Sequence, residues 1–260
     1  MIDSPSSTAA ASPGWRRLLA PLGRFFFKFR DLLFPLVFFG LALVSYPRLF
    51  LGSERWDRVL DAFGIIVALS GQLLRAVVIG FAYIRRGGKN KQVFADALVQ
   101  EGVFAHSRNP LYLGNFLALV GFCLIHNSTL CYVVGIPFFA LAYLAIVAAE
   151  EEYLQQRFGA EYEAYCRRVP RFIPTFRGLR ATLGEMKFDW KRLIRKEYGS
   201  TFAGASCIFA LLVWDAYVRH GAAGLRGLLP AVLGIWAVLV CAYLVARYLK
   251  KSGALGTGGD

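Results

Sequence analysis

The sequence predicts an all-α, polytopic membrane protein with about six transmembrane helices. Hydrophobic residues make up 57% of the 260 residues and charged residues only 18%, whereas soluble domains average about 45–50% and about 25%. The apolar residues are also gathered into stretches with almost no charge, and most of these approach the roughly 20 residues that cross a bilayer core. The stretches are residues 32–51, 59–84, 111–125, 130–149, 201–218 and 227–246.

The first two parts of the chain are a basic arm and a membrane core. Residues 1–30 form the arm, and its Ser-, Ala- and Pro-rich start lacks the basic region of a signal peptide, which predicts a disordered tail. Residues 31–176 form the core, where His126-Asn127-Ser128 predicts a tight hairpin between the third and fourth apolar stretches. Because the third stretch is short, five spans is the alternative count.

The remaining two parts follow the core. Residues 177–200 are expected to form a cytoplasmic amphipathic segment, because Met186, Trp190 and Ile194 fall at helical spacing among Lys and Arg. This pattern is typical of a helix on an anionic leaflet, and a linker helix packed on protein is the alternative. Residues 201–260 are expected to add two transmembrane helices and a tail, which pack against the core or bind a partner.

The net charge of +13 raises the question of nucleic-acid binding. The basic residues are spread over the N-terminal arm, the loop 85–91, the stretch 157–196 and the C-terminal tail. With six spans, all four segments fall on one side of the membrane, which is the positive-inside bias and predicts that both termini are cytoplasmic. Membrane topology therefore accounts for the charge, and we expect no nucleic-acid partner.

An unusual group of polar residues occurs in EGVFAHSRNPLYLGN, residues 101–115. The Gly and Pro residues predict a loop that leads into the third apolar stretch. Arg108 suits a carboxylate or a phosphate, Asn109 offers both a donor and an acceptor, and His106 is expected at the surface. Taken alone, Arg, Asn and Tyr residues such as Tyr112 are also common interfacial anchors at a membrane boundary.

A second polar cluster directly follows the fourth apolar stretch in EEEYLQQRFGAEYEAYCRRVPRFIP, residues 150–174. Neighbouring helical residues point about 100° apart, so at most one or two of Glu150, Glu151 and Glu152 face any one direction. Acids this close to a membrane are costly unless they meet a cation, and Arg108 or a cationic ligand are the candidates. Together the two clusters favour a binding site over two separate solvated ends.

The two clusters in this order resemble the isoprenylcysteine carboxyl methyltransferase family, which is related to the phospholipid methyltransferases. The resemblance rests on R-N-P-L-Y-L-G, about 35 residues of hairpin, and then E-E-x-x-L-x-x-x-F-G-x-E-Y-x-x-Y-x-x-x-V-P-R-x-x-P. It covers residues 59–176, under half of the chain. It implies that S-adenosylmethionine binds in a pocket at the cytoplasmic ends of the spans and that the acceptor is lipidic or prenylated.

Carried over by position, the resemblance also implies the residues of the site. Glu150, Glu151 and Arg108 are the expected catalytic residues: a carboxylate can take the cofactor's ammonium or ribose diol or accept a proton from an amine, and Arg108 can take the cofactor's carboxylate. The expected cofactor contacts are Leu98, Val99, Phe104, Asn109, Pro110, Leu111, Tyr112, Glu150 and Glu151. The five cysteines show no metal-ligand spacing, so no metal is expected.

Three positions depart from the pattern of that family. Asn109 replaces the usual His and cannot titrate near neutral pH, and Phe104 replaces a Tyr and lacks its hydroxyl. Ile146 stands where the eukaryotic enzymes place an Arg linked to substrate, so a prenylcysteine carboxylate would lack that partner here.

Two alternative functions remain at this point. Sterol and polyprenol reductases, which use NADPH, share a similar C-terminal pattern, but the acid after their Gly is Asn115 here and Pro110 follows the methyltransferase pattern. The second alternative is a non-catalytic membrane subunit in which the polar clusters only join the helices.

Overall fold

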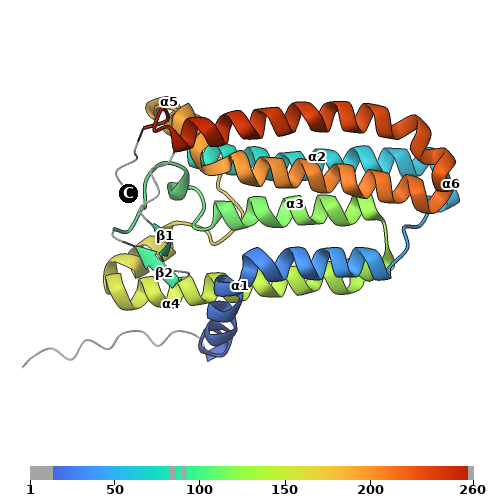
Figure 1. The fold of residues 1–260 in the computed structure, drawn as a ribbon. Coiled ribbons are helices and arrows are strands. Elements are labelled where there is room, and N and C mark those ends of the chain that lie inside the picture. Colours follow the sequence, from blue (N-terminus) through green and yellow to red (C-terminus); the bar gives the residue numbers. More distant parts are fainter. Residues whose placement is uncertain (1–13, 82–85, 90–91, 96, 257–260) are drawn as a thin grey trace, which may run out of the picture.

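The protein is a bundle of long helices in a computed structural model, which describes residues 14–81, 86–89, 92–95 and 97–256 (Figure 1). Helix α2 packs on α3, α1 packs on α4, and α6 packs on both α2 and α3. The helices are α1 (Gly14–Val44), α2 (Glu54–Phe81), α3 (Pro110–His126), α4 (Ile136–Arg168), α5 (Leu179–Glu185) and α6 (Trp190–Lys251). The short elements are η1 (Phe50–Gly52), β1 (Arg86–Lys89), β2 (Gln92–Ala95), η2 (Gly102–Ala105) and a π-helical turn, η3 (Cys131–Gly135).

The predicted all-α class is confirmed, with one small exception. Strands β1 and β2 form a two-stranded antiparallel ribbon between α2 and α3. By length and composition, three described helices are apolar enough to cross a membrane: α2, the continuous segment Cys131–Arg168, and α6. Helix α3 is apolar but has only 17 residues. The count of six spans and the orientation of the termini stay predictions.

Helix α6 consists of two arms that fold back on each other at Gly221 (Figure 1). Gly221 has φ 59° and ψ −149°, a region of backbone conformation that is essentially restricted to glycine. The two arms hold the last two apolar stretches of the sequence. Asp189 precedes helix α6 as its N-cap, and its side chain accepts a hydrogen bond from the Arg192 backbone N–H at 2.9 Å.

Part of the expected amphipathic segment packs on protein. The Phe188 ring lies against Phe81 with centroids 4.9 Å apart, and Glu197 is buried. Trp190, in contrast, is 67% exposed. The α6 helix also passes through residue 200 without a break, so its first arm joins the predicted segment to the following apolar stretch.

The predicted hairpin between α3 and α4 is confirmed. Helix α3 ends at His126, and Asn127 adopts a left-handed conformation with φ 45°. The Asn127 side-chain amide donates hydrogen bonds to the Arg48 carbonyl at 2.6 Å and to Asp57 at 3.2 Å. This turn therefore ties α3 to the start of α2 and to the segment after α1.

Candidate functional site

A cavity of about 610 Å³ lies among α1, α3 and α6, with side chains from α2, η2 and α4 completing its walls. This volume is within the roughly 300–1,000 Å³ of small-molecule sites. Its polar lining includes Arg30, Asp31, Gln72, Arg75, Asn109, Tyr112, Asn115, Tyr143, Glu150 and Ser200.

The cavity is polar at one end and apolar at the other. Helices α1, α3 and the first arm of α6 run in the same direction (Figure 1), and in each the lining includes polar residues near its start and only apolar residues toward its end. On α3 the lining passes from Asn109 and Tyr112 to Phe122, and on α1 from Arg30 to Phe39. At 1.5 Å per residue, these spacings correspond to roughly 14–20 Å along the helix. The cavity is therefore suited to an elongated amphiphilic ligand.

Tyr112 links two opposite charges at the polar end. Its hydroxyl donates to Glu150 Oε1 at 2.5 Å and accepts from Arg30 Nη1 at 3.2 Å. The guanidinium of Arg30 also lies 4.4 Å from the centroid of the Phe27 ring, a cation–π distance. Three helices thus place a carboxylate, a hydroxyl and a guanidinium together at the cavity wall.

A buried ion pair joins α2 to α6 at the same end of the cavity. Arg75 donates from Nε and Nη2 to the two carboxylate oxygens of Glu197, at 2.9 and 2.6 Å. Arg75 also donates to Asn115 on α3, and Gln72 donates to Glu197 at 3.1 Å. Such a two-point Arg–carboxylate contact fixes the orientation as well as the distance of the two helices.

Glu151 makes a second buried ion pair, behind the cavity rather than in its lining. Its carboxylate is 3% exposed and lies 3.0 Å from Arg108 Nη1 and 3.0 Å from Arg171 Nη2. Burial lowers the pKa of the Arg108 guanidinium, but Glu151, Cys166 and Tyr162 together outweigh burial, and the pKa is raised from its usual value. The expectation that Arg108 is a partner for the glutamates is confirmed.

The loop before α3 is joined to the segment that follows α4. The Arg108 backbone N–H donates to the Pro170 carbonyl at 2.9 Å, and the Asn109 side-chain amide donates to the Arg171 carbonyl at 3.1 Å. Thr175 donates from its backbone to the His106 carbonyl at 3.0 Å. These hydrogen bonds therefore join the two polar stretches of the sequence, residues 101–115 and 150–174, into one continuous unit.

The expectation that His106 lies at the surface was wrong. His106 is 6% exposed, and its ring makes hydrogen bonds with the Thr175 carbonyl at 2.8 Å and the Thr182 hydroxyl at 3.0 Å. It is buried because the segment after Pro174 folds back over it.

The structure divides the predicted site residues among three places. Glu151 and Arg108 form the buried pair, while Leu98 and Val99 line a separate, more polar cavity near Tyr165. The residues that line the main cavity are Phe104, Asn109, Pro110, Leu111, Tyr112 and Glu150. The assignment of these residues to a cofactor stays a prediction.

The contributions of Arg30, Arg75 and α6 to the cavity were not predicted from the sequence. A signal was present for Arg75, because an ionisable residue inside an apolar stretch marks a candidate site. Arg30 could be read only as the last basic residue before the first apolar stretch. The α6 residues Ser200, Ala203, Gly204 and Cys207 carry no chemical signal at all.

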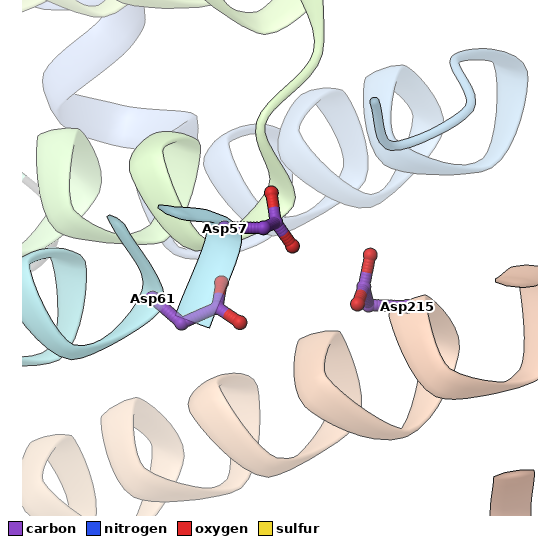
Figure 2. A group of neighbouring side chains, drawn as sticks. All are labelled: Asp57, Asp61 and Asp215. Atoms are coloured by element: carbon purple, nitrogen blue, oxygen red, sulfur yellow. The ribbon is translucent and has the colours of Figure 1, made fainter. Parts of the chain in front are cut away.

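A cluster of carboxylates lies at the end of α3 that is opposite to Asn109. Figure 2 shows Asp57 and Asp61 of α2 and Asp215 of α6 directed toward one another, each with one oxygen within 4.8 Å of the others. Arg219 forms ion pairs with Asp57 and, at 2.6 Å, with Asp215. We interpret the cluster as a buried ion-pair network that joins α6 to α2, since Arg219 supplies the cation.

Comparisons with known proteins agree on the middle of the chain. Cobalt-zinc-cadmium resistance protein CzcN of Cupriavidus metallidurans is 31% identical over 134 residues, which are 48% of this chain and 56% of that protein. Protein-S-isoprenylcysteine O-methyltransferase B of Arabidopsis thaliana is 32% identical over 144 residues, or 51% of this chain and 66% of that protein. The chain spans somewhat over half the length of the resistance proteins it matches. No solved structure matches it.

Residues 60–161 match the family described as phospholipid methyltransferase. The matched segment contains the loop that starts α3, with Asn109 and Tyr112, and the glutamates at the end of the fourth apolar stretch. Through this segment the chain belongs to the phospholipid methyltransferase family, with distant homology to the isoprenylcysteine O-methyltransferases.

Proposed function

We propose that the protein transfers a methyl group from S-adenosylmethionine to a lipidic or prenylated acceptor at the cytoplasmic face of a membrane. The observation that carries this proposal is the joint lining of one cavity by Asn109, Tyr112 and Glu150, which lie in the segment that matches the family. The apolar remainder of the cavity, which continues along α1 and α3, suits an acceptor with a hydrocarbon part.

The residues present fit the chemical groups of S-adenosylmethionine. Glu150 offers a carboxylate for the ammonium or the ribose diol, and Phe104 and Leu111 offer apolar surface for the adenine. Arg108 is paired with Glu151 behind the cavity, whereas Arg30 reaches the cavity wall beside Tyr112. We therefore assign the cofactor's carboxylate to Arg30 rather than to Arg108.

The protein's own residues mainly bind, orient and exclude water. When bound, the cofactor supplies a methyl group already activated by its sulfonium, and the electrons of the broken S–C bond remain on sulfur. Tyr112 holds Glu150 in place through the 2.5 Å hydrogen bond, and the surrounding side chains align the acceptor with the methyl carbon. For an amine acceptor, Glu150 accepts the proton that the amine loses. A carboxylate acceptor needs no such base.

Titration of the purified protein with S-adenosylhomocysteine and with NADPH tests the proposal. Binding of S-adenosylhomocysteine alone supports the transferase, and binding of NADPH alone favours the reductase alternative. Binding of neither favours a non-catalytic subunit, an alternative that also has to be considered because two of the relatives are named for metal resistance rather than for methyl transfer. Lipid extracts incubated with methyl-labelled cofactor and resolved by mass would then identify the acceptor.

A further inference from the structure

Helix α6 lies outside the segment that matches the family, yet it forms one wall of the cavity. Its first arm runs beside α2 and α3 (Figure 1) and is held there by the ion pair between Glu197 and Arg75. The lining residues Ala203, Gly204 and Cys207 follow Ser200 at helical spacing and thus share one face of the arm.

A different face of this arm packs against the second arm of α6. The Phe202 ring lies 6.1 Å from the Trp236 ring and 4.8 Å from the Tyr243 ring, centroid to centroid. The Trp236 indole N–H donates to Ser206 at 3.0 Å. Aromatic residues thus make much of the contact between the arms. This contact lies on a different face, and it does not explain why the cavity face carries small residues.

The small residues leave room in the apolar half of the cavity. A Cβ atom added at Gly204 would have Phe122 Cζ as its nearest neighbour, at 3.9 Å, which is an ordinary van der Waals contact. Phe34 and Phe38 of α1 line the same half of the cavity. Phe39, also in the lining, is 42% exposed, so this half of the cavity reaches the outer surface of the bundle, where a membrane would supply lipid.

We infer that the first arm of α6 recognises the hydrocarbon chain of the methyl acceptor, and that Gly204 is its specificity-determining residue. The chain lies between α6 and the Phe residues of α1, and the reactive head of the acceptor lies at the polar end beside Glu150. The inference rests on the proposed function. The inference goes beyond that function in one respect: selection of the acceptor depends on α6, a helix outside the segment that matches the family.

Photolabelling with amphiphiles tests this inference. The probes are a single-chain lysophosphatidylethanolamine and an S-farnesylcysteine, each with a diazirine in the hydrocarbon chain, added to the full-length protein in detergent. Labelled peptides are identified by mass spectrometry. Either probe should label residues 200–207 of α6, and the stronger label distinguishes a phospholipid acceptor from a prenylated one.

Gly204→Phe should lower labelling of residues 200–207 about tenfold, because the new ring fills the space that the chain needs. Gly234→Phe is the matched control, since it lies on the second arm of α6, where no described atom is within 4 Å of an added Cβ. Ala203→Leu provides a second cavity variant at a more exposed position in case Gly204→Phe does not fold. Equal labelling of the cavity variants and the control would overturn the inference.

The affinity for S-adenosylhomocysteine, measured on the same preparations, separates the two proposals. We expect it to be unchanged in all three variants. If the wild-type protein binds S-adenosylhomocysteine but α6 is not labelled, the inference is overturned and the proposed function stands. Labelling without any binding of S-adenosylhomocysteine overturns the proposed function, and with it the assignment of the bound chain to a methyl acceptor.

Discussion

Three adjacent glutamates occupy three different environments, and their alanine variants should therefore behave differently. Glu151 is 3% exposed and contacts both Arg108 and Arg171. Removal of one member of a buried ion pair typically costs about 3–5 kcal/mol, because the remaining charge loses its partner and stays buried. For a chain of this size, each kcal/mol of lost stability lowers the melting temperature by about 2–4 °C. Glu151→Ala should therefore lower the melting temperature by roughly 6–20 °C.

Glu152→Ala is the matched control, one residue away. Glu152 pairs with Arg24 at 2.8 Å, but the side chains are 30% and 59% exposed, and such surface pairs contribute about 0–1 kcal/mol. The melting temperature of the Glu152→Ala variant should be lower than that of the wild-type protein by no more than about 4 °C. The assay is intrinsic fluorescence during heating of the detergent-solubilised protein at one protein and detergent concentration.

Glu150→Ala completes the series. Glu150 lines the cavity and accepts the Tyr112 hydroxyl, so its loss should weaken binding of S-adenosylhomocysteine about tenfold or more while the protein remains folded. Calorimetric titration measures this affinity. Equal melting temperatures for the Glu151 and Glu152 variants, or an unchanged affinity in the Glu150 variant, would refute the division of roles among the three carboxylates.

Further predictions concern the loop before α3, the cavity wall and the reversal of α6. Asn109→Ala removes the donor to the Arg171 carbonyl and should weaken S-adenosylhomocysteine binding in calorimetry without unfolding the protein. Tyr112→Phe keeps the ring but removes the hydroxyl between Arg30 and Glu150, and should raise the same Kd about tenfold. Gly221→Ala should destabilise the protein by about 1–3 kcal/mol in thermal unfolding, because alanine rarely adopts the backbone conformation found there. Gly227→Ala, which is within regular helix, should be neutral or stabilising by comparison.

The bundle of long helices was predictable because it depends on the local pattern of apolar residues. The turn at Asn127 and the reversal of α6 at Gly221 both fall between apolar stretches, where polar residues and glycine interrupt the pattern. The pairing of Arg108 with a glutamate was predictable too, since a carboxylate near a membrane needs a cation. The helices, the turns and the need for a cation all follow from the residues within short stretches of the chain. They can be predicted without knowing which distant segments are in contact.

The burial of His106 and the placement of Arg75 depend on contacts between segments that are far apart in the sequence. His106 is covered by the segment after Pro174, and Arg75 meets a carboxylate 122 residues later in the chain. No local pattern indicates either contact, although a cation in an apolar stretch does indicate that some partner exists.

The roles of Glu150 and Glu151 depend on the rotation of α4, which the sequence does not specify. Since neighbours on a helix point about 100° apart, two adjacent glutamates cannot both face the cavity squarely, and a motif of two carboxylates is compatible with either one in the site. The structure resolves this ambiguity through the partners: Tyr112 lies in the cavity wall and meets Glu150, whereas Arg108 and Arg171 lie behind it and meet Glu151. The paired glutamates thus combine a ligand-facing carboxylate with an adjacent one that ties the loop before α3 to the segment after α4. If this combination is what the motif requires, exchange of either glutamate should impair methyl transfer, but only the Glu151 variant should also lower thermal stability.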